Sequence, residues 1–323
     1  MSTAQKTGRN HKMKYLTKST AMFLALFFFA LIGFSVPKHE SYNVSDPENC
    51  RLSFSVVSDS HIEGNNLPRF KSFMALLGGI KANERKNDAV VFLGDNTMNG
   101  QDIENMLFGG AILRANFKTP VLVAEGNHDV GNGEDDYNKL TKRFLSYANN
   151  AFDLGIEKPY YYKEIGGYYF IVLSSEWYEG NEVHGFSDEQ LIWLNGVVQK
   201  ASAEGKPVFV FGHYTFWEVK SENHNLVDIL TKYKNVYYFH GHNHADFDEY
   251  SLSYFAGTAI INLPKWDNLP DGEISLNGNT GAGVLVEVYD DRVVVKGRDF
   301  ITDRPLAERT YKFDGDNYDY VIR

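Results

Sequence analysis

Five short polar clusters along the chain combine residue types that could bind metal ions. They are Asp59-x-His61, Gly94-Asp95, Gly126-Asn127-His128-Asp129, Gly212-His213 and Gly241-His242-x-His244. Carboxylates, a carboxamide and imidazoles together suit divalent ions with a mixed nitrogen and oxygen preference, such as manganese, iron or zinc. The only cysteine is Cys50, so the sequence excludes an intrachain disulfide and a multi-cysteine zinc site.

The five clusters together indicate a metal site more specifically than any single cluster does. A Gly-Asp pair is usually a turn, and a histidine after a strand is more often a packed side chain than a ligand. Asp95 has two carboxylate oxygens and is the natural residue to bridge two ions. Two ions about 3.5–4 Å apart can polarise a phosphoryl group and ionise a water molecule. Gly126 and Asn127 allow a sharp turn, where left-handed backbone conformations cost little, and this turn places Asn127, His128 and Asp129 at the end of a strand.

The elements that must position these clusters follow from the apolar pattern. Each cluster comes directly after a short apolar run that predicts a buried strand: residues 52–58, 89–93, 119–124, 207–211 and 236–239. Apolar residues at helical spacing lie between the strands, at residues 67–84, 103–113, 137–148, 191–201 and 226–233. Open α/β sheets gather ligands at the carboxyl ends of their strands, so the five clusters are expected to converge.

The remaining segments predict antiparallel structure and one helix start. Residues 160–173 indicate a hairpin that turns at Gly166-Gly167. Ser187 and Gln190 match a capping box at the start of a helix. Strands are expected at residues 259–263, 283–289, 292–300 and 309–313, with no helix among them. The sequence therefore predicts a mixed-sheet α/β domain that is closed by antiparallel strands.

The charge of the chain limits its partners. The net charge is −10, and the first twenty residues hold five basic residues and no acidic one, so the remainder carries −15. A body this acidic is a poor general binder of nucleic acid. It remains compatible with a small phosphoester substrate when bound metal supplies local positive charge. Aromatic residues at 177, 178, 217 and 266 could stack on a nucleotide-like group.

The basic N-terminal end leads into an apolar run at residues 21–36, which predicts a signal peptide or an uncleaved membrane anchor. The protein is therefore expected to be exported: secreted, periplasmic or membrane-anchored with its catalytic domain outside the cytoplasm. The predicted domain limits are a signal peptide or anchor at residues 1–36, a linker at 37–50, a catalytic core at 51–250 and a β-rich extension packed on it at 251–323.

The ordered set of clusters resembles the calcineurin-like metallophosphoesterase superfamily, and its Asp-x-His start is similar to the phosphodiesterase-type branch. The resemblance covers roughly residues 52–245. It implies a four-layer α/β-β/α sandwich, in which helices flank two mixed sheets, and a dinuclear metal centre. By this resemblance one ion takes Asp59, His61, Asp95 and His244, and the other takes Asp95, Asn127, His213 and His242. The sequence departs from the family at Tyr214-Thr215, where a proline is often found two residues after the fourth histidine.

The resemblance implies a metal-dependent phosphoesterase that prefers diesters to monoesters and uses a hydroxide activated by two divalent ions. His128 matches the family's non-ligand histidine, which protonates the leaving group or stabilises charge at phosphorus. Asn127 adds a hydrogen-bond donor to the catalytic set. Asp129 is expected either to orient His128 or to cap the next segment. The alternative is a non-catalytic or single-metal binding scaffold of the same fold at the cell surface.

Overall fold

A computed structural model describes residues 44–82, 87–131, 136–176, 185–217, 224–265 and 281–314. The chain divides into two units, residues 1–36 and 37–323, and all described residues belong to the second. The predicted export segment thus lies outside the described residues, as does the first half of the predicted linker. Within the described ranges, no helix combines the length and apolarity needed to cross a bilayer.

The first of two six-stranded sheets holds the strands that carry the first three clusters. Its order is β12-β11-β10-β1-β2-β3. β1, β2 and β3 run parallel, and β10, β11 and β12 continue the sheet in antiparallel pairs. The bounds are β1 Leu52–Val57, β2 Ala89–Leu93, β3 Val121–Ala124, β10 Ala282–Val288, β11 Arg292–Asp299 and β12 Arg304–Lys312.

The second sheet holds the strands that carry the last two clusters. Its order is β4-β5-β6-β7-β9-β8, with β5, β6, β7 and β9 parallel and one antiparallel strand at each edge. The bounds are β4 Tyr161–Ile165, β5 Tyr168–Val172, β6 Val208–Phe211, β7 Val236–His240, β8 Leu252–Phe255 and β9 Thr258–Asn262. β4 and β5 form the predicted hairpin, and Gly166 and Gly167 turn it with φ of 60° and 78°.

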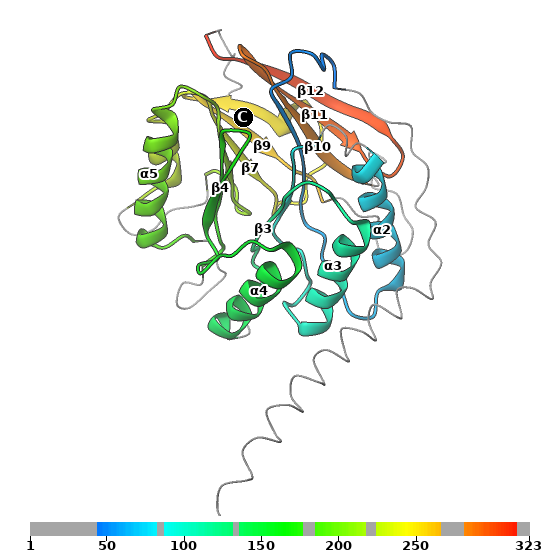
Figure 1. Cartoon of the computed structure of the whole chain (residues 1–323). Helices are drawn as coiled ribbons and strands as arrows, with labels where there is room; N and C mark the ends of the chain where they lie inside the picture. Colours follow the sequence, from blue (N-terminus) through cyan, green and yellow to red (C-terminus); the bar gives the residue numbers. More distant parts are fainter. Residues whose placement is uncertain are drawn as a thin grey trace, which may run out of the picture. The chain divides into compact units, whose positions relative to one another are not determined.

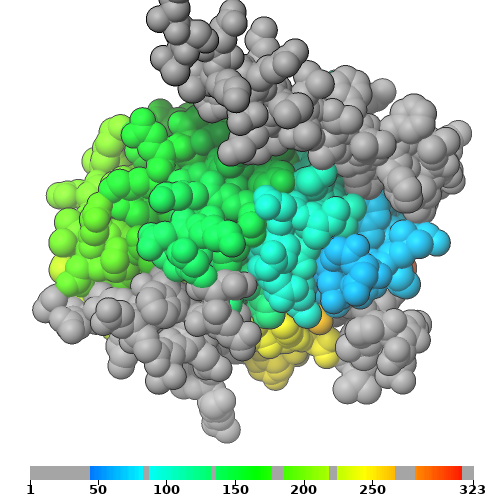
Figure 2. Space-filling model, turned by 90° about the horizontal axis from the view of Figure 1, so that it is seen from below, coloured from blue at the N-terminus to red at the C-terminus, as the bar shows by residue number. Residues whose placement is uncertain are grey.

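Helices flank both sheets, as the four-layer prediction requires. α2, α3 and α4 lie together beside the first sheet, and α5 lies on the other side of the molecule (Figure 1). Figure 2 shows the blue, cyan and green surfaces of α2, α3 and α4 side by side. The bounds are α2 Leu67–Ala82, α3 Asp102–Ala115, α4 Tyr137–Phe152, α5 Asp188–Ser202 and α6 Leu226–Leu230, with a 3-10 turn at Glu249–Ser251. The fold is therefore two mixed sheets with flanking helices, as predicted.

An aromatic core joins the two sheets face to face. Phe54 of β1 lies with its ring centroid 4.9 Å from both Phe170 and Phe209 and 6.0 Å from both Phe211 and Phe239, all in the second sheet. These edge-to-face contacts are the preferred geometry of aromatic pairs and contribute about 0.5–1.5 kcal/mol each beyond area burial. The core fixes the separation of the sheets and thus of the strand ends beyond it.

The two sheets also meet at one edge through isolated parallel bridges. Ser58, just after β1, bridges Lys265 beyond β9, and Glu125, just after β3, bridges Ser174 beyond β5. Both bridges lie at the carboxyl ends of parallel strands. The ends of the two sheets are therefore joined, and residues far apart in sequence share one edge.

Two local features differ from the sequence prediction. The Ser187 side chain caps α5 by accepting a hydrogen bond from the Gln190 amide at 3.2 Å. The Gln190 side chain does not complete the capping box, because it pairs with the backbone N–H and C=O of Ser174 at 2.9 and 3.1 Å. β8 was not predicted; side chains of Arg309 and Tyr311 on β12 donate hydrogen bonds to carbonyls of this edge strand.

A buried ion pair fastens the N-terminal linker to the first sheet. Lys296 of β11 lies 2.6 Å from Glu287 of β10, and both side chains are buried. Tyr289 donates to Glu287 at 2.7 Å, and the Ser45 amide does so at 3.3 Å. Lys296 also donates to the Ser45 hydroxyl. Every group in the cluster is thus hydrogen-bonded, as a buried pair requires.

Replacing Lys296 by methionine should leave the Glu287 carboxylate buried without a cation. We expect the free energy of unfolding, measured by urea denaturation, to fall by about 3–5 kcal/mol. The exposed pair of Arg51 and Asp290, at 2.6 Å, supplies the control: Arg51→Met should change stability by less than about 1 kcal/mol. Equal effects of the two variants would contradict the assigned role of the buried pair.

Candidate metal centre

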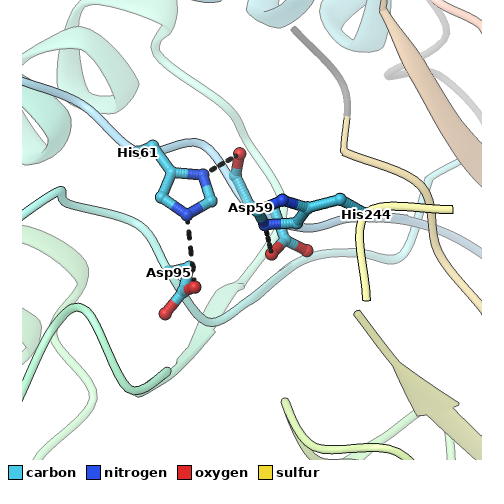
Figure 3. Close-up of side chains that lie close together, drawn as sticks. All are labelled: Asp59, His61, Asp95 and His244. Atoms are coloured by element: carbon cyan, nitrogen blue, oxygen red, sulfur yellow. Dashed lines mark hydrogen bonds and ion pairs between the residues drawn. The ribbon is translucent and has the colours of Figure 1, made fainter. Parts of the chain in front are cut away.

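The structure brings six of the predicted metal ligands together at the joined edge of the sheets. Asp59, His61, Asp95 and His244 form one group of possible ligands (Figure 3), and Asp95, His213 and His242 form a second. Within each group the ligand atoms lie within 4.8 Å of one another. Asp95 belongs to both groups, so the two groups of possible ligands are adjacent and share one carboxylate.

The first group is made by the loops after β1, β2 and β7. His61 Nε2 lies 3.2 Å from Asp95 Oδ2, and His244 Nε2 lies 3.1 Å from Asp59 Oδ1. The carbonyl oxygen of Asp59 lies 2.9 Å from His61 Nδ1 and orients this ring. The His244 side chain is 39% exposed whereas Asp59 is fully buried, so the group opens to solvent on the His244 side.

The second group takes His213 from the loop after β6 and His242 from the loop after β7, and it shares Asp95 with the first group. His213 Nε2 lies 3.1 Å from Asp95 Oδ2, and the Leu93 carbonyl lies 3.0 Å from His213 Nδ1. Asn127, on the loop after β3, places its Oδ1 atom 3.1 Å from His242 Nδ1. The carboxamide thus joins the second group, which is the place that the resemblance implies for it.

Left-handed backbone occurs at most of these ligands. Five have positive φ: Asp59 at 57°, His61 at 43°, Asp95 at 47°, His242 at 72° and His244 at 50°. Each such conformation costs a non-glycine residue roughly 1–3 kcal/mol, and it persists only when the surrounding structure enforces it. These backbone conformations direct the two ligand side chains of one loop, such as Asp59 and His61, toward the ligand groups.

Hydrogen bonds between neighbouring loops hold these conformations. The amides of Asp59 and His61 donate to the carbonyls of Gly94 and Asp95 at 3.1 and 2.7 Å. Arg69 of α2, nearly buried, donates from Nη1 to the His61 carbonyl at 3.1 Å. The Asp-x-His loop is therefore fixed both by the adjacent strand end and by a cation that motif analysis did not identify.

Gly126 and Gly241 allow close approach of ligand loops, and no left-handed backbone occurs at Gly126-Asn127, where it was expected to cost little. Gly126 and Asn127 are absent from the positive-φ residues of the described chain. A Cβ atom on Gly126 would lie 2.1 Å from Asp95 Oδ1, and one on Gly241 would lie 2.3 Å from Asp59 Oδ2. These two glycines are required because the ligating carboxylates pack directly against their backbone.

Neither role predicted for Asp129 matches its contacts. Its carboxylate accepts hydrogen bonds from the Gly126 amide at 2.9 Å and from backbone and side-chain groups of Asn96 and Thr97 at 2.7–3.2 Å. α4 is capped by Asp136 instead. Asp129 therefore ties the loop after β2 to the loop after β3, and acts on the site by holding these loops in register.

His128 is the histidine of the clusters that lies outside both ligand groups. Its ring stacks edge-on against His61 with centroids 4.8 Å apart. The Met98 carbonyl lies 2.8 Å from its Nδ1 atom, and its amide donates to Asp95 Oδ1 at 2.9 Å. Since a carbonyl only accepts, Nδ1 carries the proton, and Nε2 is the atom available to a substrate.

Attraction between the buried carboxylates and the neighbouring imidazoles determines the direction of the pKa shifts in the ligand groups. Burial opposes ionisation of Asp59 and Asp95, yet the neighbouring histidines, chiefly His213, lower the pKa of both carboxyl groups. Burial likewise opposes protonation of His61 and His213, but Asp95 and Asp59 raise the pKa of both imidazoles, that of His213 to about 9. In the metal-free protein, protons therefore supply the positive charge that the carboxylates require.

Two buried atoms without hydrogen-bond partners indicate that a metal ion suits the two ligand groups better than these protons do. Asp59 Oδ1 and His213 Nε2 make no hydrogen bond within the described part of the chain, although each lies near an oppositely charged group. Buried polar atoms are nearly always satisfied in native proteins. Both atoms belong to the two groups and face each other at 3.9 Å. The donor set, imidazole nitrogen with carboxylate and carboxamide oxygen, suits divalent ions.

Tyr214 is a contact of the site that the sequence flagged only as a departure from the family. Its fully buried ring lies 5.1 Å from the His242 ring, and its carbonyl accepts a hydrogen bond from Tyr238 at 2.7 Å. Among the predicted stacking residues, only Trp217 is described. It is 47% exposed and packs edge-on against Phe255, while residues 177, 178 and 266 lie outside the described residues.

The joined strand ends and the two ligand groups that share a carboxylate place the protein in the class of two-sheet α/β proteins with candidate metal ligands at the carboxyl ends of their strands. The model of the calcineurin-like phosphoesterase family matches residues 52–246, which include every predicted ligand. The chain belongs to this family.

The individual proteins that resemble this chain share only a minority of its residues. The chain is 24% identical over 273 residues to acid sphingomyelinase-like phosphodiesterase 3b of Mus musculus, which covers 70% of this chain and 58% of that protein. It is 30% identical over 200 residues to a probable glycerophosphodiester phosphodiesterase, GpdQ, of Arcobacter nitrofigilis, covering 56% of this chain and 67% of the relative. A dimetal phosphatase from Danio rerio shares the fold, with a TM-score of 0.57, 18% identity, and coverage of 82% of this chain and 100% of that one.

Gly126→Ala should disturb both ligand groups at once, because the new Cβ atom displaces the shared Asp95. We expect metal affinity to fall about 10–100-fold, as for other residues that position ligands. Gly196→Ala in α5 is the control, since no atom lies within 4 Å of the position that its new Cβ atom would take. Circular dichroism would establish folding, and elemental analysis after dialysis would give metal content. Equal metal content in the two variants would contradict this role of Gly126.

Protons and metal ions should compete for the His213 imidazole, so metal affinity should depend on pH. The His213 pKa of about 9 exceeds the ordinary value of 6.5, so its charge stabilises the metal-free fold fully below pH 6.5, and this contribution is lost as pH rises through about 9. Metal must displace the same proton, so affinity should rise over that interval. Calorimetry in buffers of different ionisation enthalpy would measure the released protons. Binding at pH 7.5 without proton release would contradict the assignment.

Proposed function

We propose that this protein is a metal-dependent phosphodiesterase that works with two divalent ions, manganese, iron or zinc. The observation that carries the proposal is the convergence of two ligand groups on the shared carboxylate of Asp95. Asp59, His61 and His244 would complete one ion site, and Asn127, His213 and His242 the other. Bound there, the ions would polarise the phosphoryl oxygens and make a water molecule nucleophilic near neutral pH.

The chain's own residues supply the positioning and the proton. The buried carboxylates of Asp59 and Asp95 would fix the place of the ions, and the ions would position the phosphoryl group, because hydrogen bonds between neighbouring loops hold both carboxylates. His128 would give a proton from Nε2 to the leaving oxygen, since Nδ1 is committed to the Met98 carbonyl. It must therefore enter the reaction as the imidazolium and leave as the neutral ring.

The relatives named as phosphodiesterases support a preference for a diester over a monoester. The acidic composition of the chain favours the same choice, because a monoester is mostly a dianion at neutral pH and brings one more negative charge than a diester.

The apolar, basic N-terminal segment supports a place outside the cytoplasm for this activity. We infer that residues 1–36 direct export, either as a cleaved signal peptide or as an anchor. The substrate would then be a small phosphoester met outside the cytoplasm.

The direct test is metal-dependent hydrolysis by the full chain. After chelation and add-back of manganese, zinc or iron, the protein should cleave bis(4-nitrophenyl) phosphate with a higher kcat/KM than 4-nitrophenyl phosphate. His128→Ala should reduce kcat about 10²–10⁴-fold on a dialkyl phosphodiester, whose alkoxide leaving group needs a proton, while metal content persists.

The ligand variant His242→Ala is the matched control, and it should lose metal and activity together. Absence of metal-dependent hydrolysis of both esters would refute the enzyme proposal. Full activity of His128→Ala would remove only that residue from the mechanism. One ion per chain in the active protein would refute the dinuclear form.

A further inference from the structure

A buried carboxylate lies behind the His128 imidazole, on the far side of one peptide group. The Met98 carbonyl oxygen lies 2.8 Å from His128 Nδ1. The N–H of the same peptide group belongs to Asn99, and it donates to Glu104 Oε2 at 2.9 Å. A trans peptide group is planar, and its C=O and N–H point in opposite directions. A bond that fixes the N–H therefore also fixes the direction in which the carbonyl meets the imidazole.

The surroundings of Glu104 fit an ionised carboxylate. This residue lies in the first turn of α3, and its side chain is buried. Besides the Asn99 amide, it accepts hydrogen bonds from the Asn99 side chain and from the Gln101 amide, both at 3.0 Å. All of these donors are N–H groups, and an ionised carboxylate only accepts. Hydrogen bonds to a charged acceptor are stronger than those between neutral groups, so the carboxylate holds this loop firmly.

Helix capping explains only part of this arrangement. Glu104 is the third residue of α3, and a glutamate there ordinarily reaches back to the amide of the N-cap residue, which is Gln101. The bonds to the backbone and side chain of Asn99 are additional, because Asn99 lies before the N-cap. Glu104 therefore holds the loop that precedes the helix as well as the start of the helix.

Other hydrogen bonds fix the rest of this loop. The Met98 amide donates to the Ile62 carbonyl at 3.0 Å, and the Gly100 amide donates to the Thr97 hydroxyl at 3.1 Å. Arg143 of α4 donates from Nη1 to the Gly100 carbonyl at 2.6 Å. The Met98 carbonyl is thus presented to the imidazole by a loop that is bonded on both sides of it.

We propose that Glu104 is a positioning residue for His128 and acts through the peptide group between them. The proposal rests on the proposed function, in which His128 protonates the leaving oxygen. The carboxylate polarises the peptide group through its N–H, which makes the carbonyl a stronger acceptor for Nδ1–H. Because Nδ1 keeps its proton in this bond, Nε2 is the nitrogen that gives its proton up. A carboxylate commonly orients a histidine that transfers protons, and here a peptide group lies between the two.

Two esters that differ only in their leaving group test this role on the metal-loaded full chain. Ethyl 4-nitrophenyl phosphate releases 4-nitrophenolate, which leaves without a proton, whereas diethyl phosphate releases an alkoxide that needs one. Glu104→Met should reduce kcat for diethyl phosphate about 10–100-fold, the range known for partners that orient a metal-bound histidine. KM, metal content and kcat for the aryl ester should stay the same. In a His128→Ala background the change should cause no further loss, because the two residues act as a unit.

Glu104→Gln is the conservative variant. Glu104 Oε2 accepts from both the Asn99 and the Gln101 amide, so a glutamine oxygen at this place keeps both bonds. The Asn99 side chain can turn its amide to accept from the new NH2 group. Only the charge is lost, and charge-assisted bonds are roughly twice as strong as neutral ones, so kcat for diethyl phosphate should fall less than in Glu104→Met.

Asp136→Ala is the matched control. It removes another helix-capping carboxylate, the N-cap of α4, which accepts a hydrogen bond from the Lys139 amide at 3.2 Å. Loss of such a cap lowers stability. The ratio of the kcat values for the two esters should nevertheless stay as it is in the wild-type chain.

Nitrogen-15 NMR of the histidine-labelled, zinc-loaded protein gives a readout that does not depend on turnover. The His128 ring, assigned by its absence in His128→Ala, should show an Nδ1–H proton that exchanges slowly with water. Glu104→Met should make this proton exchange faster, because the carbonyl that holds it is no longer fixed. Glu104→Gln and Asp136→Ala should leave its exchange unchanged.

The outcomes separate this proposal from the proposed function. An equal loss of kcat on both esters in Glu104→Met, the same selective loss in Asp136→Ala, or an unchanged Nδ1–H signal in Glu104→Met would overturn the positioning role and leave the phosphodiesterase standing. If the wild-type chain cleaved only the aryl ester, proton donation by His128 and its positioning would fall together. Failure to cleave either ester with any of the metals would overturn the phosphodiesterase itself, and this role with it.

Discussion

Two buried carboxylates, Asp59 and Asp95, impose the constraint on which the rest of the structure depends. Without positive charge beside them they could not stay ionised in the interior, and in the metal-free chain the surrounding imidazoles supply that charge as protons. Five ligands adopt left-handed backbone to achieve this arrangement. The strain is tolerated because each loop is hydrogen-bonded to its neighbour, through Arg69, Asp129 and the Gly94 and Asp95 carbonyls.

The architecture makes such convergence possible at a single place. Parallel strands deliver their loops to the same edge, and two sheets that pack through Phe54 bring two such edges together. The bridges Ser58–Lys265 and Glu125–Ser174 then join the sheets at the level of the ligands. A single sheet would place the His213 and His242 loops beside one another, but it would not bring the Asp59 and Asp95 loops across from them.

The sequence predicted every strand except β8, and the clusters at the strand ends, because these follow from local pattern. The assignment of the ligands to two ions comes from the family motif and stays a prediction. The sequence did not predict how the loops are held. The role of Gly126 depends on the approach of Asp95, thirty-one residues away, and the partners of Asp129 lie on the loop after β2. Gln190 fits a local capping box, yet the buried Ser174 backbone takes its side chain. Each miss arises from a tertiary contact that overrides a local preference.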